Sequence, residues 1–376
     1  MKILQLLTHH DLMPGGAVQA WWLAIEMARR GHEVALAYSP KRSRKKTPES
    51  RFEALQRAGV AVTEINLHTF YSVLKLRRFI HRHRFDVVHA HRRRAISRLL
   101  AATWGKRRPL LIANRGNTYH PTRREISDLN HPRYRKIIVV AHAVKRILIH
   151  DGIYPDKICV IYGAVDTDEF SPQVDGAAVR RELFPDAPVA PIVGMLANID
   201  RKKSHDVFIR MAARIIEKRP DVRFAAVGRG ESSGFQPLLR KLNIHEKTVF
   251  TGYRSDAAAT LAAFDISVIT ASEGEGLTGA IRESLSMAKP VVATDVGGNR
   301  EIVHNEKTGL LVPPGDPDAL AAGVLRLLEN PLMAAEMGRE GRRLVMGRFS
   351  LTARGDAMET LYTEVLHQET GRQAKA

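Results

Sequence analysis

Short apolar segments alternate with helical segments along the whole chain, and this alternation restricts the fold more than any other feature. Apolar runs between helices indicate strands that are buried on both faces, which is typical of a parallel sheet. The predicted strands occupy residues 2–7, 33–38, 60–65, 86–90, 110–113, 136–141, 157–161, 190–196, 224–228, 249–252, 266–270, 290–294 and 309–312. We therefore expect two α/β domains in tandem, with the ligand site in a cleft beyond the carboxyl ends of the strands.

The domain boundaries follow from length and from one irregular segment. A chain of 376 residues exceeds what one hydrophobic core usually covers, so two domains are expected. Residues 170–191 are rich in Pro and Asp and have no clear period, which places the join there. We predict an N-terminal domain at 1–170, a C-terminal domain at 171–350, and a final helix at 351–376 that packs back towards the N-terminal domain.

Cysteine content and hydropathy bear on the compartment. The single cysteine, Cys159, excludes an internal disulfide and a cysteine-rich zinc site. No signal peptide is visible, and no run approaches the roughly 20 apolar residues that span a bilayer. We expect a cytoplasmic protein, either free or at the cytoplasmic face of the inner membrane.

The net charge of +18 is distributed unevenly along the chain. Residues 1–170 carry 31 Lys and Arg against 14 Asp and Glu, so residues 171–376 contribute almost none of the net charge. Such a field favours an anionic partner, whether phospholipid, phosphorylated glycan or nucleic acid, although a solvated charged surface is the alternative. The basic clusters lie at 41–46, 75–84, 92–94, 106–108 and 133–136.

The segment Glu273 to Glu283, which reads EGEGLTGAIRE, carries the clearest chemical signal. A glycine-rich loop follows the strand at 266–270 and leads into a helix at 279–288, whose free N–H groups and positive dipole end suit a phosphate. We place Glu275 in the loop and Glu283 in the first turns of the helix, where each carboxylate can accept hydrogen bonds from vicinal hydroxyls. An acidic loop before an ordinary helix is the alternative.

The same segment carries a family resemblance. EGLTGAIRE has the Glu-x7-Glu spacing of the retaining GT-B enzymes of glycosyltransferase family 4, the glycosyl transferases group 1. It continues as ESLSMAKPVVATDVGGNREIVHNEKTGLLVPPGD, which resembles the family's most diagnostic stretch, with Ser284-Leu-Ser-Met as its departure. The resemblance implies two Rossmann-like domains that face each other across a cleft, the first binding the acceptor and the second the nucleotide-sugar donor.

The resemblance also implies roles for residues of the second half. Glu275 would bind hydroxyls of the donor sugar, and Glu283 would bind the ribose. The diphosphate would face the backbone near Leu277, Thr278, Gly279 and Ala280, although Leu277-Thr278 replaces the common Phe-Gly.

Two cations of the second half complete the implied donor site. Lys203 matches the lysine of the family's Lys-Gly-x-Asp element and would neutralise the diphosphate. Met195 stands at the position where the family usually has an arginine. We expect Arg201 to take the role of that arginine. Positive charge is needed where the departing diphosphate builds up negative charge.

In the first half, the resemblance assigns donor contacts to Gly15 and Gly16, because glycine lets backbone approach a phosphate or sugar. Asp-Val-Val-His-Ala-His ends at His91, which we expect at the end of a strand, where it would position the sugar. Asn114 and Arg115 stand where relatives carry another histidine. Arg115 either replaces that histidine or binds an anionic acceptor.

Asp166-Thr-Asp168 has the Asp-x-Asp form that binds a metal in other glycosyltransferases. It lies in a segment that resembles the family's interdomain Asn-Gly-Val-Asp element, so we predict a structural turn and no metal. No cofactor is expected beyond the substrate nucleotide.

The activity implied by the resemblance is transfer of a glycosyl group from a nucleoside diphosphate sugar to an acceptor hydroxyl, with retention of configuration. UDP is favoured over GDP. The acceptor is expected to be a lipopolysaccharide, glycolipid or other cell-envelope glycan, and the basic N-terminal domain is expected to contact an anionic membrane peripherally. The alternatives are a nucleotide-sugar epimerase of the same fold and a nucleic-acid-binding protein, although aromatic residues are only 6% of the chain.

Overall fold

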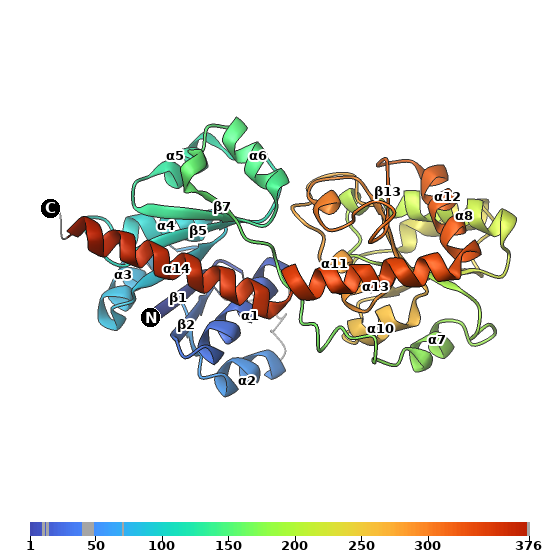
Figure 1. Cartoon of the computed structure of the whole chain (residues 1–376), viewed down its shortest axis with the longest axis horizontal. Coiled ribbons are helices and arrows are strands. Elements are labelled where there is room, and N and C mark those ends of the chain that lie inside the picture. The colour runs from blue at the N-terminus through green and yellow to red at the C-terminus, as the bar shows by residue number, and fades with distance from the viewer. Residues whose placement is uncertain (10–11, 13–14, 40–48, 70, 374–376) are drawn as a thin grey trace. The chain divides into compact units, whose positions relative to one another are not determined.

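The computed structural model describes all residues except 10–11, 13–14, 40–48, 70 and 374–376, so the basic cluster at 41–46 lies outside the described residues. The chain divides into two compact units (Figure 1). Unit 1 comprises Met1–Ala164 and Leu351–Ala376, and unit 2 comprises Val165–Ser350. Unit 1 thus ends before the join predicted after residue 170, and the irregular segment 170–191 belongs to unit 2.

Unit 1 is built on a seven-stranded parallel sheet with the order β3-β2-β1-β4-β5-β6-β7. Its strands are β1 (Lys2–Leu7), β2 (Glu33–Tyr38), β3 (Ala61–Glu64), β4 (Val87–His91), β5 (Leu110–Arg115), β6 (Tyr134–Val139) and β7 (Ile158–Val160). Its helices are α1 (Gly15–Arg29), α2 (Glu49–Arg57), α3 (Ser72–His83), α4 (Arg93–Ala102), α5 (Arg123–Asn130), α6 (His142–His150), the short η1 (Pro155–Lys157) and α14 (Leu351–Gln373).

The C-terminal helix α14 forms part of the core of unit 1. Its residues Met358, Leu361, Tyr362 and Val365 are buried in one cluster with side chains of α1, α2 and the sheet. Arg30, at the end of α1, forms ion pairs with Asp356 and Glu359 of α14 at 2.8 and 3.0 Å. Apolar burial therefore holds α14 on the face of the sheet that α1 and α2 also cover.

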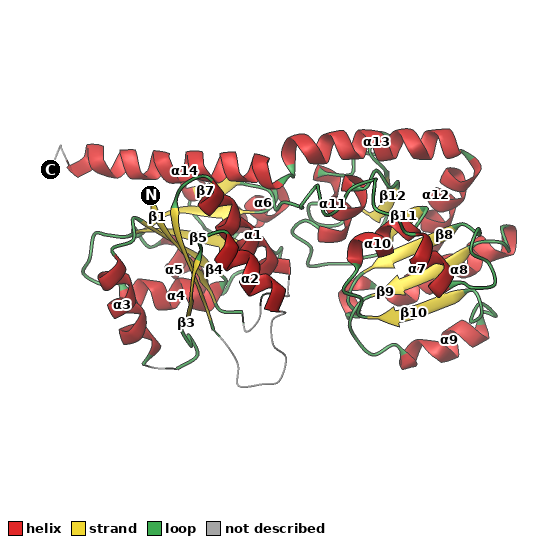
Figure 2. Ribbon diagram, turned by 90° about the horizontal axis from the view of Figure 1, so that it is seen from below, coloured by secondary structure: helices red, strands yellow, loops and turns green. Residues whose placement is uncertain are grey.

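Unit 2 is built on a six-stranded parallel sheet with the order β10-β9-β8-β11-β12-β13, and helices lie on both sides of its strands (Figure 2). The strands are β8 (Ile192–Leu196), β9 (Arg223–Val227), β10 (Thr248–Gly252), β11 (Ile266–Ile269), β12 (Val291–Thr294) and β13 (Leu310–Val312). The helices are α7 (Ala177–Leu183), α8 (His205–Lys218), α9 (Gln236–Lys241), α10 (Ala257–Ala263), α11 (Gly279–Ser286), α12 (Pro317–Glu329) and α13 (Pro331–Arg348). Three short 3-10 turns are η2 (Arg201–Lys203), η3 (Ser233–Phe235) and η4 (Asn299–Glu301).

Each predicted strand is confirmed, and both sheets are parallel as expected. The strands read as apolar runs because helices cover both faces, and β4, β11 and β12 are buried at every position. In each sheet the chain first builds outward to one side and then returns to the other side. The order therefore reverses between β1 and β4 in unit 1 and between β8 and β11 in unit 2, and such reversal points are where loops open to admit a ligand.

Within the described residues, no helix has both the length and the apolar character that crossing a membrane requires.

Candidate functional site

In unit 2, two loops meet beyond the carboxyl ends of β8 and β11, where the strand order reverses. The loop after β8 contains η2 with Lys203, and the loop after β11 contains Glu275. Lys203 Nζ lies 2.6 Å from Glu275 Oε1, although 72 residues separate them in sequence. Both side chains are largely shielded, at 22% and 16% exposure, so water screens this pair less than a surface pair.

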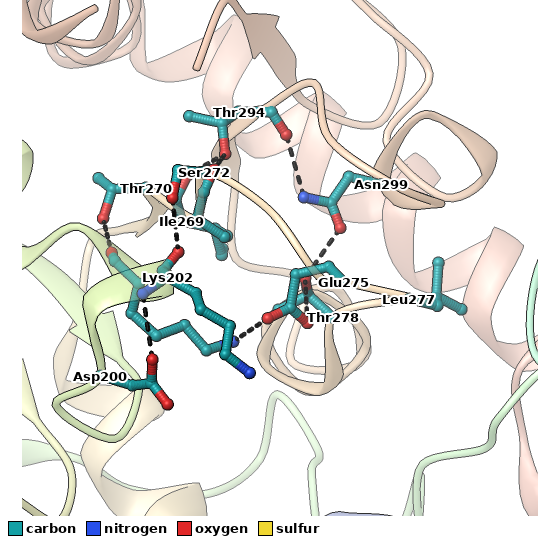
Figure 3. Close-up of polar contacts among 12 residues, drawn as sticks. Asp200, Lys202, Ile269, Thr270, Ser272, Glu275, Leu277, Thr278, Thr294 and Asn299 are labelled. Carbon is teal, nitrogen blue, oxygen red and sulfur yellow. Dashed lines mark hydrogen bonds and ion pairs between the residues drawn. The ribbon is translucent and has the colours of Figure 1, made fainter. Parts of the chain in front are cut away.

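Backbone contacts fix the two loops to each other. The hydroxyl of Thr270 donates to the carbonyl of Lys203 at 2.6 Å. The N–H of Ser272 donates to the carbonyl of Lys202 at 2.8 Å (Figure 3). The position of the ammonium relative to the carboxylate is therefore set by the backbone as well as by the ion pair.

A third loop supports Glu275 from the other side. The Thr278 hydroxyl donates to Asn299 Oδ1 at 2.8 Å and lies 3.4 Å from Glu275 Oε2. The Asn299 amide donates in turn to the carbonyl of Thr294 at 3.0 Å, so the chain of contacts ends on β12 (Figure 3). Because Thr278 and Asn299 are buried, this arrangement is a fixed support for the carboxylate.

The N-terminus of α11 is open to an anion. Thr278 is the residue before the helix, yet its hydroxyl is engaged by Asn299 and caps no N–H of the first turn. The N–H groups that begin at Gly279 and Ala280 therefore keep their hydrogen-bonding capacity for a ligand such as a phosphate. Leu277 is buried, and the helix starts at Gly279 in spite of the Leu277-Thr278 pair that replaces the family's Phe-Gly.

Glu283 lies in the second turn of α11, close to where the sequence places it. A Cβ on Gly279 would be 3.6 Å from Glu283 Oε1, so the carboxylate lies directly beside the start of the helix. Burial raises the pKa of Glu283, and the neighbouring Arg282 opposes that rise. No side chain among the described residues donates a hydrogen bond to this carboxylate, which leaves it free to accept hydroxyl groups.

Arg282 belongs to this site, and sequence reasoning missed it. Its side chain is only 7% exposed and donates to the carbonyl of Leu277 at 3.3 Å. Burial lowers its pKa to about 10, while the charges of Glu283 and Glu275 act in the opposite direction. The guanidinium stays charged at neutral pH. The sequence shows only an arginine within a short helix that follows a buried strand. An arginine in that position is usually assumed to face solvent, so its burial could not be read from the sequence.

Arg201, the predicted partner of Lys203, lies in the same turn but differs in environment. Its side chain is 90% exposed and pairs with Glu273 at 3.0 Å. The structure therefore brings Lys203, Glu275, Glu283, Thr278, Gly279 and Ala280 together around α11, with Arg201 at the exposed border of the group.

In unit 1, the corresponding reversal point borders a cavity of about 930 Å³. His91, at the end of β4, lines it together with Asn114 and Arg115 at the end of β5 and Gly16 at the start of α1. Gly15 opens the same helix and is exposed.

His91 is part of a buried polar network. Its Nε2 lies 2.8 Å from Gln5 Oε1, and the Gln5 amide donates to the Tyr362 hydroxyl at 3.3 Å. That hydroxyl lies 2.8 Å from His89 Nδ1. Burial lowers the pKa of His91 well below its usual value, so His91 is a neutral imidazole at physiological pH and offers hydrogen bonding without charge.

Arg115 is held by protein partners. It donates to Glu125 at 2.7 Å and to the carbonyl of Tyr119 at 2.7 Å. Glu125 also closes a capping box with Thr122 at the start of α5. Arg115 therefore braces the segment between β5 and α5. The side-chain oxygen of neighbouring Asn114 is buried and has no hydrogen-bond partner among the described residues.

Asp166 forms a turn, as its sequence context predicts. Its Oδ1 accepts hydrogen bonds from the backbone N–H groups of Asp168 and Glu169 at 3.1 and 3.2 Å. That carboxylate oxygen is thus used to shape the chain. Metal independence of the reaction remains a prediction.

The chain matches known families over both units. Residues 14–169 match the family described as Glycosyltransferase Family 4, and residues 190–330 match Glycosyl transferases group 1.

Individual relatives match at moderate identity. The chain is 24% identical over 312 residues to an Escherichia coli enzyme named UDP-Gal:alpha-D-GlcNAc-diphosphoundecaprenol alpha-1,3-galactosyltransferase, covering 78% of this chain and 79% of that one. It is 33% identical over 208 residues to a GDP-mannose-dependent phosphatidylinositol monomannoside mannosyltransferase of Mycolicibacterium smegmatis, covering 52% and 54%. The chain spans about half the length of several of the curated relatives it matches.

Among solved structures, HepE of Anabaena in complex with UDP and glucose superposes with a TM-score of 0.83 at 21% identity, covering 96% of this chain and all of that one. This likeness shows the fold. Together with the two family matches and the two parallel-sheet units, it establishes that the chain belongs to the glycosyltransferases of family 4 and has the GT-B fold.

Proposed function

We propose that the protein transfers a glycosyl group from a nucleoside diphosphate sugar to an acceptor hydroxyl with retention of anomeric configuration. The observation that carries the proposal is the Lys203–Glu275 pair, 2.6 Å apart, beside the uncapped N-terminus of α11. Such a donor has a diphosphate, a sugar and a ribose: the cation and the free N–H groups suit the diphosphate, and the carboxylates of Glu275 and Glu283 suit the hydroxyls of the sugar and the ribose.

Each part of the donor has a proposed partner. The N–H groups at Gly279 and Ala280 bind the diphosphate with Lys203, Glu275 accepts sugar hydroxyls, and Glu283 accepts the ribose hydroxyls. The existing Lys203–Glu275 contact keeps both charges paired until the donor arrives. Contributions of Gly15, Gly16 and His91 to donor binding remain predictions made from the sequence.

The transfer breaks the bond between the anomeric carbon and the diphosphate oxygen and forms one to the acceptor oxygen. The departing diphosphate accepts the acceptor's proton, and Lys203 stabilises the negative charge that develops on it, with Arg201 as a second, more exposed cation. No metal is required by this scheme, because protein cations and helix N–H groups supply the positive charge. Retention is the course that membership in the family implies.

UDP is the proposed nucleotide, and a cell-envelope glycan such as lipopolysaccharide or a glycolipid is the proposed acceptor. The relative named for UDP-galactose supports UDP, whereas the mannosyltransferase relative is named for GDP-mannose, so both nucleotides belong in the test. The positive charge of residues 1–170 supports an anionic acceptor and peripheral contact with an anionic membrane at its cytoplasmic face.

Thermal unfolding in the presence of nucleotides tests the donor site. A ligand at about 100 times its Kd adds roughly 2.7 kcal/mol to the free energy of unfolding. We expect UDP, in chelator, to stabilise the wild type and to have no effect on Glu283→Ala. Glu217→Ala, an exposed glutamate of α8, is the matched control and should respond like the wild type. No stabilisation by UDP, GDP or ADP would overturn the proposal.

Product analysis separates transfer from epimerisation. A transferase consumes the donor in step with a glycosylated acceptor, whose anomeric configuration NMR reports directly. Conversion of the donor sugar into its epimer without any acceptor would instead identify an epimerase.

A further inference from the structure

The cavity of unit 1 is surrounded by arginines to an extent that donor chemistry does not explain. Its lining includes two carboxylates, Glu125 and Asp128, against six guanidinium groups. The arginines are Arg92, Arg93, Arg94, Arg98, Arg115 and Arg124. The excess of positive charge in one concave site focuses its field on whatever occupies it.

Protein partners account for only some of these cations. Arg115 pairs with Glu125 at 2.7 Å, and Arg93 approaches the same carboxylate at 3.9 Å. Arg94 contacts His68, and Asp128 accepts a hydrogen bond from Ser97.

Three guanidinium groups remain. Among the described residues, the side chains of Arg92, Arg98 and Arg124 have neither an ion pair nor a hydrogen bond, and all three line the cavity. Each therefore has its donors available for a ligand.

The backbone at Arg92 adds a second indication. Arg92 precedes α4 with φ of 74° and ψ of 155°, a conformation that glycine adopts readily and other residues rarely. Within the part of the chain that the structure describes, no side chain caps the ten-residue helix α4, so its first N–H groups are also available to a ligand. Strain of this kind persists where a functional group must be held in place, and here it holds an arginine at the open end of a helix dipole.

We propose that this cavity binds a phosphate or diphosphate group carried by the acceptor, with Arg92, Arg98 and Arg124 as its ligands. The inference rests on the proposed transferase function. Planar guanidinium forks match the oxygens of a phosphate in pairs, and a helix N-terminus adds further donors. A diphosphate carries enough charge to balance three free cations, which a single carboxylate does not. The acceptor is then a phosphorylated sugar or a lipid-linked sugar diphosphate.

Calorimetric titration with inorganic pyrophosphate tests the site directly. The titration is done on Lys203→Ala and on wild type saturated with UDP, so that binding at α11 is suppressed in both. The test variant combines Arg92→Gly, Arg98→Gln and Arg124→Gln. Glycine at 92 also relieves the backbone strain, which protects the fold.

A matched control exists at the opposite edge of the same sheet, where a second cavity is lined by α3 and by the segments before β4 and β5. The control variant combines Arg78→Gln, Arg82→Gln and Lys106→Gln, which remove the same number of positive charges from that second cavity. We expect pyrophosphate affinity to fall at least tenfold in the test variant and to stay within twofold in the control. An equal loss in both triple variants, or no binding to the wild type, would overturn the inference.

The source of the phosphate is resolved by two further probes. Glucose 6-phosphate represents a soluble acceptor, and farnesyl diphosphate in detergent micelles represents a lipid-linked one. Stronger binding of either, sensitive to the test variant, supports the site and identifies its source. Thermal stabilisation by UDP is measured on every sample: UDP binding without any phosphate binding overturns this inference alone, whereas absence of nucleotide binding overturns the proposed function.

Discussion

The backbone of Gly297 packs directly against the backbone of Glu275. A Cβ built on Gly297 would lie 1.8 Å from the carbonyl oxygen of Glu275, and the glycine itself has φ of +56°. The loop after β12 therefore fixes the position of the loop that carries the Glu275 carboxylate. Only a residue without a side chain permits this close approach.

We predict that Gly297→Ala abolishes stabilisation by UDP-sugars, because the new methyl group must displace the backbone of Glu275. Gly315→Ala is the control: Gly315 has φ of +76°, and apart from its chain neighbours no described residue lies within 4 Å of its added Cβ. Both variants should lose about 1 kcal/mol of unfolding free energy from left-handed strain, and Gly297→Ala should lose more because its methyl group meets the backbone of Glu275. Nucleotide titration of the two folded variants provides the measurement, and equal affinities would show that the close approach has no influence on the site.

Lys203→Met should lower kcat/KM by about 100-fold, as expected when a group that stabilises developing charge is removed. Methionine retains most of the length of the lysine side chain, so packing around η2 changes little. Lys218→Met, at the end of α8, provides a charge-matched control with unchanged kinetics. Initial rates with a UDP-sugar decide the matter; an unaltered kcat/KM would remove Lys203 from the mechanism.

Arg282→Leu tests the contribution of Arg282 to donor affinity. Removing the guanidinium alone leaves the buried carboxylate of Glu283 without its neighbouring positive charge, so we expect a lower Tm as well. Because Arg282 acts electrostatically on both Glu275 and Glu283, its loss should raise the KM for the donor at least tenfold through carboxylate–diphosphate repulsion. Steady-state kinetics together with calorimetry distinguish this outcome from a purely structural role, in which Tm falls and KM does not change.

The histidine network should make unit 1 sensitive to acid. Burial lowers the pKa of His89 to about 3, whereas an unfolded histidine has a pKa of about 6.5. Between these values the unfolded chain binds a proton that the folded chain does not, so the free energy of unfolding falls as pH decreases, by about 1.4 kcal/mol per pH unit for this group. His91 acts in the same direction.

Urea unfolding at pH 7.5, 6.5 and 5.5 measures this dependence. His89→Gln should show a shallower loss of stability on acidification than the wild type, because one titrating group is gone. The exposed His81→Gln, at the end of α3, should keep the wild-type slope. Parallel curves for wild type and His89→Gln would contradict the assignment.

The local elements were predictable because their causes are local. The strand β11 is an apolar run, and the glycines that follow it forecast a loop leading to a helix N-terminus. The placement of Glu275 in the loop and of Glu283 in the helix follows from the same segment and agrees with the structure. The end of β4 at His91 was likewise predictable, although its burial and its bond to Gln5 were not.

The partners of the charged residues were not predictable in this way. Its sequence position predicts that Arg115 either replaces a histidine of the relatives or binds an anionic acceptor, yet Glu125 and the carbonyl of Tyr119 already engage it. Nothing in the sequence distinguishes Arg92, Arg98 and Arg124 from Arg115. Only the fold shows which guanidinium groups are paired and which are free. The burial of Arg282 was unpredictable for the same reason, because whether an arginine on a short helix is buried depends on what packs over it.

The sequence by itself determined the two parallel α/β units and the chemistry of the segment from Glu273 to Glu283, since apolar patterning and glycine placement act over a few residues. The tertiary structure alone decided that Lys203 meets Glu275 and that three arginines around one cavity have no partner among the described residues. The physical reason is strand order: β8 and β11 are neighbours in the sheet although two other strands separate them in the chain, and that order arises from packing across the whole unit.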